Sequence, residues 1–159
     1  MWKNLIFVIA FVWVPYAYSG PLDPIVSMVW VGETVPEQTA VTLQLNLTTI
    51  KAVKLVSVSS PFVESIEIHS LINHKGVMKV RSVQSLSFPA HGTTTFGSKN
   101  LFLMMSGIKK PLKIGEPMPV NLTFVFADNR SKTISIDAEV RKVELSYKHY
   151  GPNKVYDHR

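Results

Sequence analysis

Residues 68–107, IHSLINHKGVMKVRSVQSLSFPAHGTTTFGSKNLFLMMSG, contain the pattern that decides the fold class of this chain. The polar segment 73–76 ends in a glycine and separates two segments of strand composition, 62–71 and 77–83, which is typical of a β-hairpin. A third strand-like segment, 101–105, follows after further turn residues. This part of the chain therefore predicts antiparallel strands joined by tight turns.

The segments on either side carry the same signal. Apolar and polar residues alternate through residues 40–47, where Val41, Leu43 and Leu45 share one side. Strict alternation of this kind predicts a strand with one buried face. Further strands are expected at residues 25–31, 53–58, 120–126 and 132–140, and a loop at residues 107–119. Two short segments, residues 86–88 and 93–96, carry a weaker strand signal. Eight or nine short strands without a helical period predict an all-β domain, built as a sandwich or barrel.

The N-terminal residues predict export. Lys3 precedes an almost wholly apolar run that breaks at Pro15, and small residues follow just before Gly20. Residues 1–19 are therefore expected to be a secretory signal peptide. A permanent membrane helix is the alternative, but the apolar run is short for one. We expect a periplasmic protein without stable membrane insertion after the signal is cleaved.

The remaining chain is long enough for one domain with its own core, expected over residues 20–143 and followed by a flexible tail over residues 144–159. The absence of cysteine excludes disulfides, thiolate zinc sites and cysteine nucleophiles, and predicts no lipid anchor on cysteine. The formal net charge is +6, but the basic residues are scattered, so no nucleic-acid partner is predicted. Motifs of hydrolases, zinc proteases and phosphate-binding loops are missing from the sequence, and no enzyme is predicted.

Histidine and methionine in the expected hairpin indicate a metal site instead. Imidazole and thioether groups suit soft or borderline metals, Cu(I) above all. The hairpin is expected to turn about His74 and Lys75. On that register His69 lies opposite Val80 and diagonal to Met78 on the same face of the sheet, about 7–8 Å away. Both side chains would then reach one ion.

The expected strand that ends the quoted stretch offers further donors. A period of two puts Asn100, Phe102 and Met104 on one face. Met104 supplies a thioether, whereas the amide oxygen of Asn100 is a hard donor and a poor ligand for Cu(I). The candidate metal ligands are therefore His69, Met78 and Met104, with Asn100 and His74 as additional donors. The alternative is that His69 is an ordinary surface histidine and that the methionines fill gaps in the core.

The order and spacing of several short motifs resemble the PCuAC family of periplasmic copper chaperones. The resemblance covers nearly all of residues 20–143, and the 21 residues between Met78 and Asn100 match the family's gap between its methionine and its second histidine. The segments that carry the resemblance are Val29-Trp30-Val31, residues 55–61, residues 66–69, residues 76–81, residues 88–92, residues 106–112, residues 115–120 and Leu122-Thr123-Phe124.

This resemblance implies a cupredoxin-like Greek-key β-sandwich that carries Cu(I), or Cu(II), outside the cytoplasm. It also implies delivery of copper to the copper-centre subunit of a cytochrome oxidase, alongside a thioredoxin-like copper carrier. By position, the family's ligands fall on His69, Met78, Asn100 and Phe102. Asn100-Leu101-Phe102 thus replaces the second His-x-Met and leaves a depleted ligand set. The alternative is a family member that has lost the metal and serves as a protein-interaction or structural β domain.

Overall fold

The computed structural model describes residues 23–98 and 100–143, so the expected signal peptide and C-terminal tail lie outside the described residues. Within this part of the chain there are ten strands and no helix, and hence no helix that could cross a membrane. The strands are β1 (Ile25–Gly32), β2 (Ala40–Thr49), β3 (Val53–Ser59), β4 (Val63–His74), β5 (Val77–Val83), β6 (Leu86–Phe88), β7 (Gly92–Phe96), β8 (Leu101–Ile108), β9 (Pro117–Phe126) and β10 (Ser131–Arg141). The all-β prediction is confirmed, although the structure has ten strands where eight or nine were expected.

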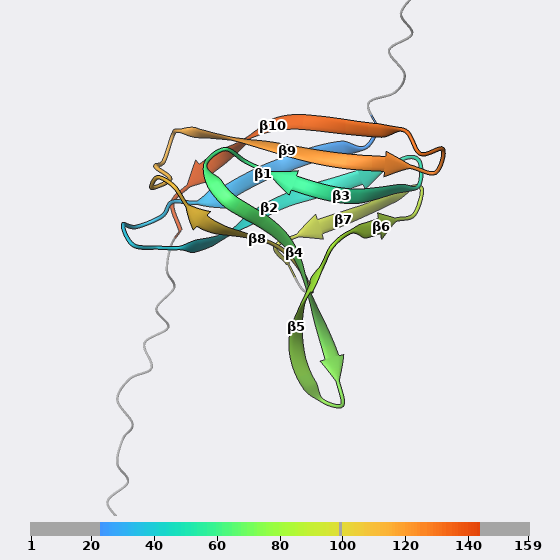
Figure 1. Ribbon diagram of the computed structural model, residues 1–159, viewed down its shortest axis with the longest axis horizontal. Helices are drawn as coiled ribbons and strands as arrows, with labels where there is room; N and C mark the ends of the chain where they lie inside the picture. Colours follow the sequence, from blue (N-terminus) through green and yellow to red (C-terminus); the bar gives the residue numbers. More distant parts are fainter. Residues whose placement is uncertain (1–22, 99, 144–159) are drawn as a thin grey trace, which may run out of the picture.

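The strands form one mixed sheet in the order β5-β4-β8-β2-β1-β10-β9-β3-β6, with β7 paired to the second half of β2. Only β1 and β10 run parallel among the described pairs. Buried side chains of β2 and β9 belong to one hydrophobic cluster, although β1 and β10 separate these strands within the sheet. The sheet therefore folds over on itself and encloses the core between two layers (Figure 1), as in a cupredoxin-like sandwich.

The core follows the alternation seen in the sequence. Leu43, Leu45 and Leu47 of β2 are at most 1% exposed, and their polar neighbours face outward. On the other layer, β9 buries every second residue from Met118 to Phe124 in the same way. The loop between β8 and β9 is shorter than the expected residues 107–119, because β8 continues to Ile108 and β9 begins at Pro117.

The β4–β5 hairpin projects away from the sandwich (Figure 1). Pairing of β4 with β8 ends at Ser70, and beyond Leu71 the outer part of β4 is paired with β5 alone. Lys75 and Gly76 form the loop, with φ angles of +53° and +82°. Two consecutive positive φ angles define a type I′ turn, which favours glycine at its second position. The Gly76 N–H also donates to the Asn73 Oδ1 atom at 2.9 Å.

The expected register of this hairpin is wrong by two residues. The sequence predicted a turn about His74 and Lys75, but the turn lies one residue later and pairs His69 with Ser82 rather than with Val80. The physical reason is the glycine: a turn about His74 and Lys75 would place Gly76 in the strand and force a positive φ on His74.

Candidate metal centre

His69 lies on the outer face of the sheet, where β4 is flanked by β8 and β5. His69 of β4 lies opposite Phe102 of β8 on one side and opposite Ser82 of β5 on the other. The preceding residue, Ile68, is only 4% exposed and points into the core. Because side chains alternate along a strand, the row formed by Phe102, His69 and Ser82 lies on the face turned away from the core.

Glu67 holds the imidazole of His69. The Glu67 Oε2 atom lies 3.0 Å from the His69 Nε2 atom and also accepts a hydrogen bond from the Ser82 hydroxyl at 3.2 Å. The hydrogen bond from His69, followed by the one from Ser82, holds the pKa of Glu67 below its usual value of 4.5. An ionised carboxylate only accepts, so Nε2 is the donor in this hydrogen bond, and the tautomer that donates from Nε2 has its lone pair on Nδ1. Metal-binding histidines commonly have such a carboxylate partner.

Met104 provides a soft donor beside this imidazole. It lies opposite Glu67 of β4 and Thr42 of β2, one row along from the pair of His69 and Phe102. Met104 is half-buried, whereas its neighbours Leu103 and Met105 are fully buried. His69 and Met104 are therefore diagonal neighbours on the outer face, with backbones about 7–8 Å apart. Among the candidate ligands on this face, Met104 is thus the thioether nearer to the His69 imidazole.

Met78 lies farther away than the sequence predicted. It shares the outer face with His69, but it pairs with Asn73, four residues along β4 from His69. Four strand residues correspond to about 13 Å. The expectation that His69 and Met78 are diagonal neighbours is thus wrong, because it depended on the earlier turn. Met78 is 50% exposed on the projecting hairpin.

The additional donors occupy separate positions. His74 is exposed at the end of β4 and pairs with Val77, so it faces away from the side that carries Met78 and His69. Asn100 is exposed just before β8, and its backbone oxygen accepts a hydrogen bond from the Leu71 N–H at 2.7 Å. Within the described residues, no three histidine, aspartate or glutamate side chains are grouped so that they could hold a metal ion.

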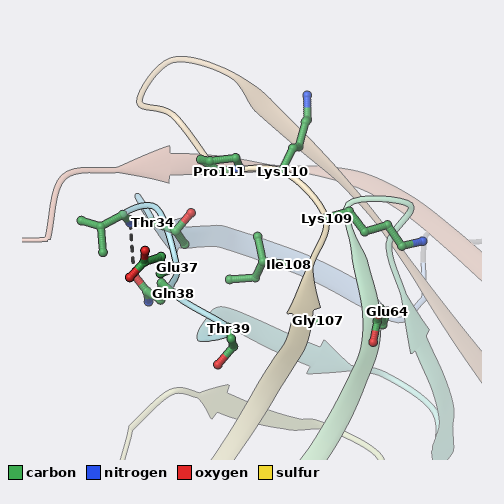
Figure 2. Close-up of a pocket in the computed structure, with 11 residues that line it drawn as sticks. Thr34, Glu37, Gln38, Thr39, Glu64, Gly107, Ile108, Lys109, Lys110 and Pro111 are labelled. Carbon is green, nitrogen blue, oxygen red and sulfur yellow. Dashed lines mark hydrogen bonds between the residues drawn. The ribbon is translucent and has the colours of Figure 1, made fainter.

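A pocket at the other end of β4 and β8 has different chemistry (Figure 2). Its volume is about 250 Å³, and neither histidine nor methionine lines it. Its ionisable side chains are those of Glu37, Glu64, Lys109 and Lys110. Glu64 lies five residues along β4 from His69, or about 16 Å. This pocket lacks soft donors and is separate from the row around His69.

Glu67 and Ser82 are site residues to which sequence reasoning gave no role. Glu67 had a local signal, because residues two apart on a strand share a face and Glu67 precedes His69 by two. Ser82 had none without the hairpin register, since it is 15 residues from Glu67 in the chain. The pairing of β4 with β5 thus brings Ser82 to Glu67 and forms the hydrogen-bonded group of Glu67, His69 and Ser82.

These features define a cupredoxin-like β domain with imidazole and thioether groups on the outer face of one layer. The chain belongs to the LpqE-like lipoprotein family, whose model matches residues 25–140. It is a PCuAC-type protein, as its motifs predicted, and so shares its domain type with the PCuAC copper chaperones. No curated protein sequence matches the chain.

Solved structures show the same fold. The copper-bound PCuAC domain from PmoF2 is 16% identical to this chain, with a TM-score of 0.59, and the match covers 74% of this chain and 92% of that domain. The apo PCuAC domain from PmoF1 is 17% identical, with the same TM-score and coverage. The solution structure of CuI-DR1885 from Deinococcus radiodurans is 27% identical, with a TM-score of 0.58, and the match covers 79% of this chain and 82% of that one.

Proposed function

We propose that the protein is an exported chaperone that binds Cu(I) on the outer face of β4 and β8 and transfers it to a periplasmic acceptor. The observation that carries this proposal is the hydrogen-bonded pair of Glu67 and His69 beside the thioether of Met104. The carboxylate orients the imidazole and leaves its Nδ1 lone pair for the ion. The family membership and the copper-bound structural relatives support the same function.

The ligand set in this proposal is depleted. Asn100 and Phe102 stand where the PCuAC pattern has His-x-Met, and neither side chain supplies a soft donor. The ion is then held mainly by His69 and Met104. Met78, on the same face of the hairpin, becomes a third ligand when the hairpin bends toward His69. Asn100 and His74 are outer donors that meet the ion on its way in or out.

A depleted set suits transfer. A site with few soft ligands near the surface exchanges its ion readily with an acceptor that offers more donors. We propose the copper-centre subunit of a cytochrome oxidase, or a thioredoxin-like copper carrier, as the acceptor in the periplasm. The resemblance of the motifs to PCuAC chaperones supports this choice of acceptor.

A second function competes with this one. The chain would be a family member that no longer binds metal and instead binds a protein partner. The replacement of both second ligands by Asn100 and Phe102 favours it, as does the exposure of apolar side chains on β5. The two functions differ in whether copper is bound at all.

Anaerobic titration of Cu(I) against a competing chromogenic chelator separates the two functions. The variants are His69→Ala, Met104→Leu and their combination, with Met28→Leu as the matched control. Met28 is a 66% exposed methionine on β1, a strand that pairs with neither β4 nor β8 among the described residues. The copper function requires that the double variant bind much more weakly than the wild type and the control. Equal Cu(I) binding by all of these proteins would argue against the copper function and favour the metal-free one.

A further inference from the structure

The outer edge of β5 is open. β5 is the terminal strand of the sheet, and no other strand among the described residues pairs with its outer side. Every residue from Asn73 to Ser82 is exposed, including Val77 at 57% and Val80 at 63%. A long exposed edge strand with apolar side chains is a template for pairing with another chain. The projecting hairpin (Figure 1) places this edge clear of the sandwich.

The backbone of β5 presents hydrogen-bonding groups at that edge. Leu71 donates its N–H to Asn100 on the β8 side, so its backbone groups are turned away from β5. In an antiparallel pair, two residues that lie directly opposite turn their backbone groups either toward each other or both outward. Val80 lies opposite Leu71, so the backbone N–H and C=O of Val80 also point away from β4. This direction alternates along the strand, so the backbone groups of Met78 and Ser82 point outward as well. β5 therefore offers N–H and C=O groups at three positions to an added strand.

The side chains of β5 divide between two faces. Lys79 and Arg81 lie on one face, and Met78 and Val80 lie on the other. Residues 73–83 contain no acidic side chain. Neither Lys79 nor Arg81 lies within 4.0 Å of a carboxylate in the part of the chain that the structure describes. One face of the edge thus carries both basic side chains together with Val77, and the other carries Met78, Val80 and Ser82.

We propose that the outer edge of β5 is a docking site for an extended segment of a partner protein, with acidic side chains on one face and apolar side chains on the other. An added strand alternates its side chains in step with those of β5. Its acidic residues lie beside Lys79 and Arg81, and its apolar residues lie beside Met78 and Val80. Main-chain hydrogen bonds supply affinity, and the alternating pattern supplies specificity.

A second copy of this chain fits the edge poorly. Antiparallel pairing of two β5 strands centred on Val80 places Lys79 of one copy opposite Arg81 of the other. Like charges directly opposite each other destabilise a strand pair. The basic residues therefore oppose self-association, a usual role of charge on edge strands, while they attract an acidic segment.

The docking edge does not depend on copper. It uses the backbone of β5 and the side chains of Lys79, Val80 and Arg81, which are not in the proposed ligand set, and it shares only Met78 with that set. Met78 and Val80 share the outer face with His69, so a partner docked at β5 lies on the side of the sheet that carries the proposed copper ligands. His69→Ala separates the two ideas, because it removes the imidazole and leaves the edge intact.

The test is an NMR titration of the ¹⁵N-labelled protein with a synthetic peptide of alternating glutamate and valine. We expect amide shifts concentrated in β5, no shifts with a lysine–valine peptide, and weaker binding as salt is added. Val80→Pro removes the outward N–H without removing a hairpin hydrogen bond, and it should weaken binding by roughly tenfold or more. Val80→Thr keeps the N–H and the branched shape, and should bind as the wild type does.

Further variants make the result of the peptide titration decisive. Lys79→Gln/Arg81→Gln should weaken peptide binding even if the proline variant folds poorly. His69→Ala should bind the peptide normally, whatever the copper titration shows. Equal binding by Val80→Pro and Val80→Thr would overturn the proposal. So would shifts outside β5, or binding only to vesicles of phosphatidylcholine and phosphatidylglycerol. Concentration-dependent dimerisation through β5 would also overturn it.

Discussion

Glu67 and His69 lie two residues apart on the outer face of β4, and their Oε2 and Nε2 atoms are 3.0 Å apart. Ser82, across the hairpin, donates to the same carboxylate oxygen. We expect Glu67→Gln to weaken Cu(I) binding by roughly 10–100-fold, because a neutral amide orients the imidazole less firmly. A chelator competition titration measures this. Glu64→Gln, on the same strand but in the distant pocket, is the control and should bind copper as the wild type does.

The titration of Glu67 provides a test that needs no metal. Its two hydrogen bonds lower the pKa below 4.5, and the one from His69 has the larger effect. In a pH titration followed by ¹³C NMR of the side-chain carboxyl, we expect a midpoint below 4.5. His69→Ala should raise that midpoint more than Ser82→Ala does. The opposite order would show that the imidazole is not the main partner of the carboxylate.

The same lowered pKa fixes the direction of a stability effect. Because the folded-state pKa of Glu67 lies below that of the unfolded chain, its hydrogen bonds contribute fully above about pH 4.5. The contribution is lost as the pH falls through the lowered folded-state value. The free energy of unfolding should therefore fall less steeply with acid in Glu67→Gln than in the wild type. Urea denaturation at a series of pH values measures this difference.

Restoring the missing donors should strengthen copper binding. Asn100→His/Phe102→Met adds an imidazole just before β8 and a thioether on the face that carries His69 and Met104. We expect each added donor to tighten Cu(I) binding by roughly tenfold or more, where each tenfold corresponds to about 1.4 kcal/mol. Asn100→Gln/Phe102→Leu changes the same positions without adding a soft ligand, and it should bind as the wild type does. Equal affinities in the two double variants would argue against a site here.

The hairpin turn should be sensitive to one glycine. Gly76 has a φ of +82°, so Gly76→Ala should lower the free energy of unfolding by about 1 kcal/mol, or fray the hairpin locally. Hydrogen exchange of the β5 amides, together with chemical denaturation, distinguishes the two results. Gly92→Ala is the control, because an added Cβ there meets other atoms only at 3.8 Å or more. It should change stability little.

Adjacent residues of β8 should differ sharply in their contribution to stability. Leu103 is fully buried, so Leu103→Ala should cost about 2–5 kcal/mol in the free energy of unfolding. Met104 lies on the outer face and is half-buried, so Met104→Ala should cost about 1 kcal/mol or less. Thermal and urea denaturation compare the two variants. Similar losses would mean that Met104 belongs to the core and not to a copper site.

Much of the fold could be read from the sequence because its signals are local. The alternation of Leu43, Leu45 and Leu47 with polar residues reports a strand with one buried face, and the structure buries those three side chains. Gly76 at the end of a polar segment marks a turn, and the structure has one there. The motifs quoted for the PCuAC resemblance are also local patterns, and the family match confirms them.

The candidate site was harder to predict because it depends on how separate strands align. The sequence correctly placed Asn100, Phe102 and Met104 in or beside one strand, but nothing local shows that His69 lies opposite Phe102. The predicted pairing of His69 with Val80 missed the actual partner, Ser82, by two residues. That shift kept Met78 on the same face and moved it away from His69.

The sequence by itself determined the all-β class, the presence of a hairpin ending near Gly76 and the kinds of donor present, since these follow from periodicity and residue chemistry along the chain. Only the tertiary structure decided which donors meet: Met104 lies beside His69, Met78 lies far along the ribbon, and Glu67 joins His69 to Ser82. The reason is that a type I′ turn at Lys75 and Gly76 sets the register of the hairpin. A two-residue change in register leaves each side chain on the same face of the sheet but moves its cross-strand partner about 7 Å along the strand.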